Sequence, residues 1–169
     1  SLNYINLSYN KFRHIPSELF MLEELTTLYM FNNDLESISP EIQKLEKLAY
    51  LNLIGNKLTR LPKEITILSN LKEIYLSINL FKEFPRELCY MEDLEFLFLN
   101  YNEINEIPED VRNMPNLKGL YLKGNNITNV SPSLCKISSL SELDLENNQI
   151  RELPHEFKEM PKLKKLNLR

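Results

Sequence analysis

Residues 48–68 read LAYLNLIGNKLTRLPKEITIL, and the spacing of apolar residues in this stretch returns every twenty-three residues along the chain. Asparagine marks the same point of each unit, three positions after an apolar residue. It occurs at Asn10, Asn33, Asn56, Asn79, Asn102, Asn125 and Asn148. A period in this range is typical of stacked repeats, in which one unit cannot bury its apolar face without its neighbours.

The first half of each unit has the pattern of a short strand. Between Leu71 and Asn79, inward apolar residues alternate with outward ones, which is the period of two that a strand shows. One strand per unit predicts a parallel sheet, and units of equal length predict strands that stack in register. The asparagine lies where the chain leaves the strand, and its amide can bond backbone groups that the turn leaves unpaired. We therefore predict a structural column made of the seven asparagine side chains.

The second half of each unit carries a proline that begins a return segment. In five units the proline holds one position: Pro16, Pro62, Pro85, Pro108 and Pro154. A carboxylate usually follows it, and proline with a carboxylate in the first turn favours a short helix or 3-10 segment. In two units the proline comes one place later, at Pro40 and Pro132, and each follows a serine that can cap the turn.

The whole pattern, Leu-x-x-Leu-x-Leu-x-x-Asn-x-Leu-x-x-Leu-Pro-x-x-Leu-x-x-Leu, resembles that of the leucine-rich repeat family. Its twenty-three-residue Leu-Pro form is similar to the repeats of leptospiral proteins, Ras-pathway scaffolds and plant intracellular proteins. The resemblance implies an α/β repeat solenoid, a curved horseshoe with a parallel β-sheet on its concave side and short helical or 3-10 segments on its convex side. It also implies protein binding, without naming the partner.

We expect one repeat domain over residues 1–169, with seven full units and the start of an eighth. The units begin near residues 2, 25, 48, 71, 94, 117, 140 and 163. The chain opens directly on the repeat pattern and stops within an expected strand, whereas solenoids usually carry polar caps at their ends. We therefore expect the caps to be absent and the chain to be an excerpt of a longer protein.

Charge, apolar content and cysteine content limit the kinds of partner that the chain can bind and the compartment in which it works. The net charge is −4 without a basic run, which argues against nucleic-acid binding, and no apolar stretch is long enough for membrane insertion. Cys89 and Cys135 lie two units apart, about 10 Å, which is beyond disulfide reach, so both are expected to be free thiols. Few cysteines slightly favour a cytoplasmic protein, with a secreted bacterial protein as the alternative; the sequence leaves the compartment open.

The sequence contains no motif that brings catalytic or metal-binding residues together. His14 and His155 lie far apart along the stack, and neither a phosphate-binding glycine loop nor a nucleophile with its base is present. We therefore expect no enzyme and no cofactor. Glu142, Asp144 and Glu146 project together from one strand like a cation site, but basic residues on the adjacent strands are expected to pair with them. We predict no metal site there.

Function is expected on the concave face, where the outward strand residues lie. Ten of its thirty-one positions are aromatic, against six of the other 138 residues. Aromatic residues also suit strands and stack between neighbours, which is the structural alternative. Tyrosine and phenylalanine with few charges around them are typical of interface hot spots, which favours a binding surface. The predicted partner-binding residues are Tyr29, Phe31, Tyr50, Tyr75, Phe96, Phe98, Tyr101 and Tyr121.

Two further features complete the predicted face. Gly119 has no side chain between Phe96 and Glu142, which predicts an open floor able to receive a partner's anchor side chain. A charged rim that can orient a partner is predicted from Lys123, Glu142, Asp144 and Glu146. The sequence thus favours a module that binds a partner protein or peptide. Two alternatives are a regulatory segment of a larger enzyme, effector or receptor, and self-association; the oligomeric state stays open.

Overall fold

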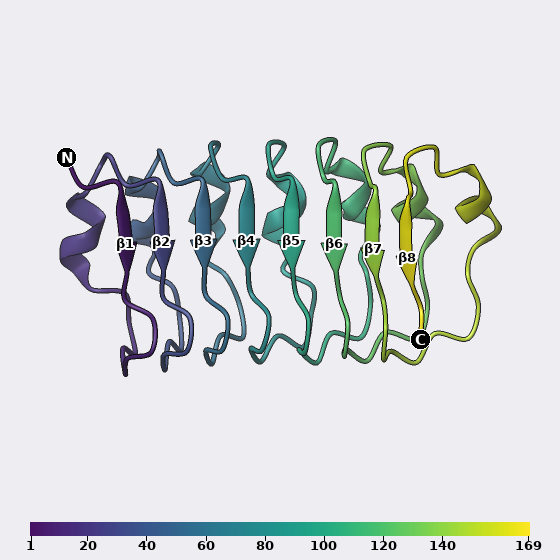
Figure 1. Cartoon of the computed structure of the whole chain (residues 1–169), viewed down its shortest axis with the longest axis horizontal. Helices are drawn as coiled ribbons and strands as arrows, with labels where there is room; N and C mark the ends of the chain where they lie inside the picture. Colours follow the sequence, from purple (N-terminus) through teal and green to yellow (C-terminus); the bar gives the residue numbers. More distant parts are fainter.

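Eight short strands, one from each repeat, form a single parallel sheet in the computed structural model, which describes residues 1–169 (Figure 1). The strands are β1 (Tyr4–Asn6), β2 (Thr27–Tyr29), β3 (Tyr50–Asn52), β4 (Glu73–Tyr75), β5 (Phe96–Phe98), β6 (Gly119–Tyr121), β7 (Glu142–Asp144) and β8 (Lys165–Asn167). They stack in sequence order and in register, so each residue faces the residue twenty-three positions on. Tyr75, for example, lies between Asn52 and Phe98.

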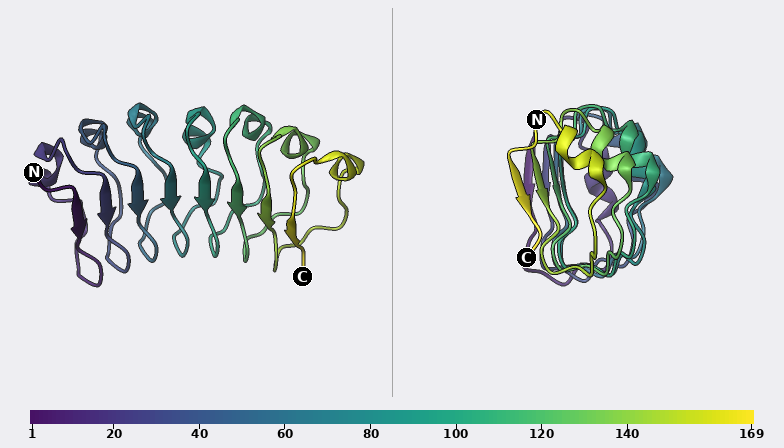
Figure 2. Two further views of the ribbon diagram at one scale, coloured as in Figure 1. Left: turned by 45° about the horizontal axis from the view of Figure 1, so that its top comes forward. Right: turned by 90° about the vertical axis from the view of Figure 1, so that its right-hand side faces the viewer.

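Seven 3-10 segments form the opposite side of the stack. They are η1 (Ser17–Met21), η2 (Pro40–Lys44), η3 (Lys63–Ile67), η4 (Arg86–Tyr90), η5 (Glu109–Asn113), η6 (Pro132–Lys136) and η7 (His155–Glu159). Five begin directly after the predicted proline. In η2 and η6 the proline is the first residue, and Ser39 and Ser131 accept a hydrogen bond from a backbone amide, as the sequence predicted. The segments lie on the outer, longer side of a gentle arc, and the strands line the inner side (Figure 2).

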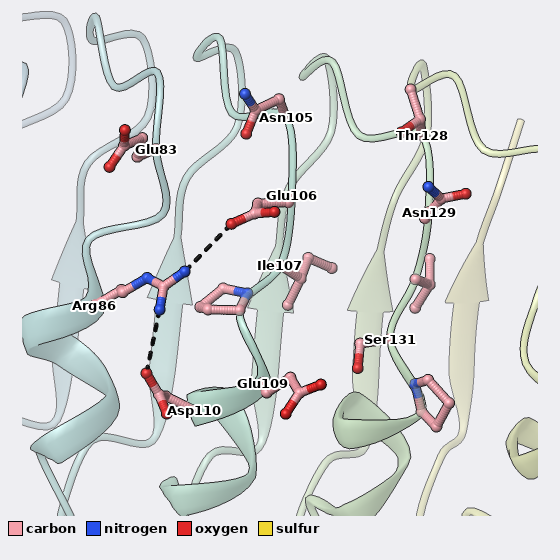
Figure 3. A pocket seen from close by; sticks show the side chains of 13 residues that line it. Glu83, Arg86, Asn105, Glu106, Ile107, Glu109, Asp110, Thr128, Asn129 and Ser131 are labelled. Carbon is pink, nitrogen blue, oxygen red and sulfur yellow. Dashed lines mark hydrogen bonds and ion pairs between the residues drawn. The ribbon is translucent and has the colours of Figure 1, made fainter.

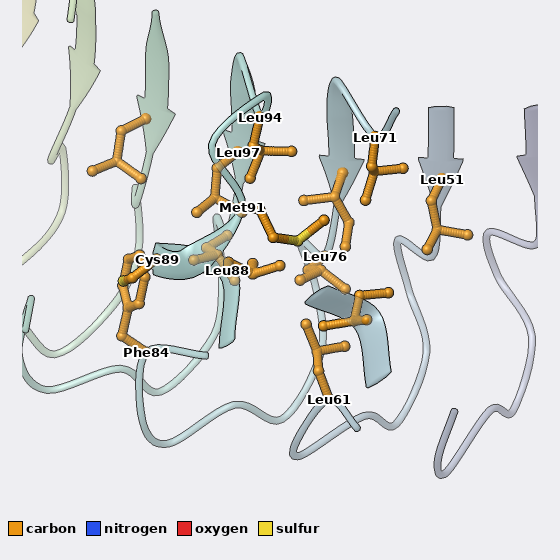
Figure 4. Packing of buried hydrophobic residues seen from close by; sticks show 14 of the residues in the cluster. Leu51, Leu61, Leu71, Leu76, Phe84, Leu88, Cys89, Met91, Leu94 and Leu97 are labelled. Atoms are coloured by element: carbon orange, nitrogen blue, oxygen red, sulfur yellow. The ribbon is translucent and has the colours of Figure 1, made fainter. Parts of the chain in front are cut away.

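A continuous apolar core fills the space between the sheet and the 3-10 segments. It contains forty-two buried residues, among them Leu51 and Leu97 from the strands and Leu88 and Met91 from the return segments (Figure 4). Each apolar column of the sequence therefore stacks on itself from unit to unit. The core needs none of the outward aromatic residues, so the concave face is free to carry other side chains.

Asparagine side chains join successive repeats at the end of the strands. Asn79 Nδ2 donates to the backbone oxygen of Leu76 in its own repeat (3.1 Å) and of Leu53 in the preceding one (2.9 Å). Its Oδ1 accepts from the amide of Leu58, also in the preceding repeat, at 2.9 Å. Asn33, Asn56, Asn102 and Asn125 make the same bonds and are buried. Asn10, in the first repeat, is exposed and bonds only its own turn.

The predicted fold class is confirmed: the chain is a solenoid with one parallel sheet and short 3-10 segments. Cys89 and Cys135 are free thiols, also as predicted. Among the helical segments, none has the length and apolar character needed to cross a membrane.

Candidate protein-binding face

Three rings stand side by side on the middle of the concave sheet. Tyr75, Phe98 and Tyr121 occupy the central outward position of β4, β5 and β6. Their ring centroids are 4.4 Å apart in both pairs, and the planes are tilted by only 3° and 4°. The spacing is close to that of paired strands, because the in-register backbone places the three rings one above the other. All three side chains are half-buried, so each ring covers its neighbour and presents an edge to the solvent. We call these three residues the aromatic stack.

Glutamates hold the hydroxyl groups at the two ends of the aromatic stack. Tyr75 donates to Glu73 on its own strand, and Tyr121 donates to Glu142 Oε2 on β7 at 2.8 Å. Burial, followed by the hydrogen bond to Glu142, raises the pKa of Tyr121 to about 12; burial and Glu73 raise the pKa of Tyr75 as well. The Tyr121 hydroxyl and then Lys165 lower the pKa of Glu142. Both tyrosines are therefore neutral hydrogen-bond donors with fixed ring orientations.

Raising the pH above 10 is expected to destabilise this chain more than its Tyr75→Phe/Tyr121→Phe variant. A tyrosine with a raised pKa stays protonated in the folded chain while it ionises, near its ordinary value of 10.0, in the unfolded chain. Its contribution to stability is therefore complete below that value and is lost as the pH rises toward the folded pKa. Urea unfolding at stepped pH values between about 9 and 12 measures the effect. Parallel stability curves for the two proteins would contradict it.

Gly119 does not open a pocket, so this prediction from the sequence is wrong. A Cβ atom built there would lie 2.7 Å from Phe96 Cδ1 and 2.9 Å from Tyr121 Cε2. The Phe96 ring leans forward from β5 over Gly119, which is buried. The space above Gly119 is therefore filled by the Phe96 ring, which packs against Tyr121 of the aromatic stack.

Gly119→Ala is expected to lower the free energy of unfolding by about 1–3 kcal/mol, because the added methyl group must displace two packed rings. Chemical unfolding measures the cost, and near-ultraviolet circular dichroism reports a change in the packing of the aromatic rings. The control is the same substitution in a Phe96→Ala background, where removal of the ring should reduce the cost. An equal cost in both backgrounds would show that ring contact is not its origin.

A second aromatic group lies at the N-terminal end of the face. Tyr4 meets Tyr29 edge to face with centroids 5.6 Å apart, and Tyr9 meets Phe31 in the same way at 5.0 Å. Tyr4 and Tyr9 were not among the predicted partner-binding residues, although they occupy outward positions of the first repeat. The repeat register could have identified them, because it places both residues on the concave face. Between this group and the aromatic stack, the small Asn52 interrupts the central column, and Tyr50 beside it is 39% exposed.

The charged rim is largely paired within the protein. Lys123 Nζ lies 3.0 Å from Glu146 Oε2, and Lys165 Nζ lies 3.0 Å from Glu142 Oε1, as expected from the strand neighbours. Asp144 Oδ1 accepts from the backbone amide of Glu146 at 3.0 Å. These bonds fix the carboxylates in place beside the aromatic stack, where they add a polar border.

A wide hollow lies away from the concave face, between η4, η5, η6 and the turns that precede them (Figure 3). It measures about 1200 Å³, and its lining is mostly polar. Arg86 bonds Glu106 at 3.3 Å and Asp110 at 3.6 Å across it. The positive charge of Arg86 already has two partners there, and the apolar lining is limited to Ile107, Val130 and two prolines. The concave face therefore holds the stronger candidate site.

Comparisons with known proteins agree with this architecture. The sequence profile described as Leucine rich repeat matches residues 23–81, 46–104, 69–127 and 115–169, and a second profile of that description matches residues 1–22. No curated protein matches the chain in the corresponding sequence comparison.

Three solved structures illustrate the similarity. A leucine-rich repeat protein of Leptospira interrogans is 34% identical with a TM-score of 0.83, over 100% of this chain and 49% of that one. An internalin of Listeria monocytogenes is 21% identical with a TM-score of 0.84, over 99% and 48%. The ectodomain of the Arabidopsis thaliana receptor kinase GASSHO1/SCHENGEN3, in complex with CASPARIAN STRIP INTEGRITY FACTOR 2, is 30% identical with a TM-score of 0.71, over 99% and 24%.

This chain spans about half the length of the leptospiral and listerial proteins. Sequence profiles cover it from end to end, and its eight-stranded solenoid matches the solved repeat structures over nearly all of its residues. The chain belongs to the leucine-rich repeat family.

Proposed function

We propose that this chain is a protein-interaction module whose concave face binds a partner protein or peptide. The observation that carries the proposal is the aromatic stack, a row of three rings on the open side of the sheet. The core is complete without it, and a row of exposed aromatic edges lowers solubility unless another molecule covers it. Large aromatic side chains contribute most of the binding energy at many interfaces, because they bury much apolar area at a small entropic cost.

The two aromatic groups define a binding path along the sheet. Tyr29 and Phe31 belong to the N-terminal group, the aromatic stack lies in the middle, and Tyr50 and Tyr101 are exposed by 39% and 50% beside them. Phe96 packs over Gly119 and supports the stack. The rim of Lys123, Glu142, Asp144 and Glu146 then sets the direction in which a partner lies, since charges at an interface edge select orientation.

Relatives support this class of function. Leucine-rich repeat proteins are commonly protein-interaction modules, and the plant receptor ectodomain described above was solved with its bound factor. The same likeness is compatible with a recognition segment of a larger receptor or effector. In both cases the binding role belongs to the concave face, and the family and fold are those of non-enzymatic interaction modules.

Affinity capture with the intact chain and a variant without the aromatic stack tests the proposal. Partners that bind the face should be recovered with the intact chain and lost with the variant, as quantified by mass spectrometry. Light scattering over a concentration series shows whether the partner is a second copy of the chain. Recovery of the same proteins by both chains would place binding on another surface.

A further inference from the structure

One position in every repeat has a left-handed backbone. It is the residue directly before the repeating asparagine, in the turn at the lower margin of the sheet in Figure 1. The φ angles are 58° at Tyr9, 53° at Asn32, 66° at Gly55, 55° at Ile78, 54° at Tyr101, 67° at Gly124 and 54° at Asn147. We call these residues the turn column. Glycine and asparagine suit this conformation, and four of the seven positions use them.

Ile78 is the residue least suited to the turn column. A β-branched side chain at positive φ is a true outlier, because its Cβ substituents crowd the backbone. The side chain is also 54% exposed, so burial in the core does not offset the strain. Tyr101 differs, since its ring packs over Gly124, where an added Cβ would lie 2.5 Å from Tyr101 Cδ1. The fold requires the left-handed turn in every repeat but does not require a β-branched residue there, and strained residues of this kind cluster at functional positions.

On the strand side Ile78 is bordered by uncharged residues, whereas beyond the asparagine the neighbouring repeats carry the exposed Lys57 and Glu103. The residue directly before each turn-column residue also faces outward, and we call these residues the third column. Over the first five repeats the turn column and the third column hold only uncharged residues. These are Ser8, Phe31, Ile54, Ser77 and Asn100, with Tyr9, Asn32, Gly55, Ile78 and Tyr101. The first charged side chain of the third column is Lys123, which pairs with Glu146. An uncharged strip of this kind suits an uncharged, apolar guest.

Backbone amides in the same strip offer hydrogen bonds. Where the central column holds Asn52, its Oδ1 accepts from the amide of Ile54 at 3.1 Å, which shows that these amides face the concave side. The amide of Asn100 finds a different acceptor, because it donates to the hydroxyl oxygen of Ser77 at 3.1 Å. The amides of Phe31 and Ser77 have no acceptor within the protein, because tyrosines occupy the central position two residues before them. Phe31 is the more exposed of the two.

We infer that this uncharged strip binds an extended, apolar segment of the partner protein, with Ile78 as its anchoring contact. The inference rests on the proposed function, because it assigns the chemistry of the partner along one margin of the same face. Apolar side chains of the segment cover Ile78 and Ile54, and its backbone carbonyl groups accept from free amides such as that of Phe31. The strain at Ile78 is then retained for binding and has no role in folding.

The first test concerns strain and needs no partner. Ile78→Asn is compared with Ile67→Asn, because Ile67 lies on η3 with 52% exposure but has no left-handed backbone. Both variants lose a half-exposed isoleucine, and only the first relieves strain. The Ile78→Asn chain should therefore unfold about 2–4 °C above the Ile67→Asn chain. An equal or lower midpoint would remove the basis of the inference.

The second test uses a library of random peptides displayed on phage as the probe. Peptides selected on the intact chain should be rich in uncharged apolar residues, and their affinity should fall roughly tenfold or more with Ile78→Asn. Ile67→Asn should leave the affinity unchanged. The inference is wrong if the Ile78→Asn chain selects as many peptides, with the same affinity, as the intact chain. It is also wrong if neither chain selects any peptide.

The outcomes also separate this inference from the proposed function. Peptides that lose affinity only when the aromatic stack is removed would support the proposed function and overturn the role of Ile78. Peptides that lose affinity with Ile78→Asn and keep it without the aromatic stack would support the strip alone.

Discussion

Replacing Tyr75, Phe98 and Tyr121 together by alanine is expected to weaken partner binding by roughly a hundredfold or more, and the best single substitution should cost about 2–4 kcal/mol. The rings stack at 4.4 Å, so removal of one also leaves its neighbour unsupported. We expect the effects to be non-additive for that reason, with Phe98 the most sensitive position because it contacts both other rings. Titration of the captured partner against each variant measures these losses.

Tyr90 provides a matched control for this prediction. It is the one tyrosine outside the concave face, lies on η4, and is 62% exposed. Tyr90→Ala should leave the affinity unchanged. The buried apolar core does not include the stack, so the triple variant should keep its far-ultraviolet circular dichroism spectrum, which verifies that the fold is intact. Wild-type affinity in a folded triple variant would refute the aromatic stack as the binding element.

Asn79→Ala or Asn102→Ala is expected to lower the free energy of unfolding by about 1–3 kcal/mol, because each truncation leaves buried backbone groups without partners. Asn79 bonds Leu53, Leu58 and Leu76, and so connects two repeats. Asn102 makes the equivalent bonds to Phe81, Leu76 and Leu99. Urea unfolding followed by far-ultraviolet circular dichroism measures the loss.

Asn10→Ala is the control for the asparagine variants. Asn10 has the same place in the repeat pattern but is exposed and bonds only Leu7 and Ser8, both in its own turn. Its substitution should cost much less, since water can replace bonds at an exposed site. Equal losses for Asn10→Ala and Asn79→Ala would mean that burial between repeats is not the origin of the effect.

Much of the candidate face was predictable from the repeat register. Because residues twenty-three positions apart become strand neighbours, the sequence alone placed Tyr75, Phe98 and Tyr121 in one row. The same rule correctly paired Lys123 with Glu146 and Lys165 with Glu142. It failed at Gly119, where an absent side chain was interpreted as an open floor. Register gives the position of each Cβ atom but not the direction in which a neighbouring ring leans.

Backbone strain was equally hidden from sequence reasoning. The residue before each asparagine varies from glycine to tyrosine, and nothing in this variation announces a left-handed turn. The hydrogen-bonding pattern of the solenoid forces that turn on every repeat, including the one that carries Ile78.

The sequence by itself determined the solenoid, its parallel sheet, the positions of the 3-10 segments and the membership of each column. It could do so because a repeated apolar spacing leaves one way to bury all its columns at once. Only the tertiary structure decided that Phe96 covers Gly119, that three rings lie flat on one another, and that Ile78 is strained and exposed. These features depend on side-chain rotamers and on the space between neighbouring repeats, which are set only when the coils pack.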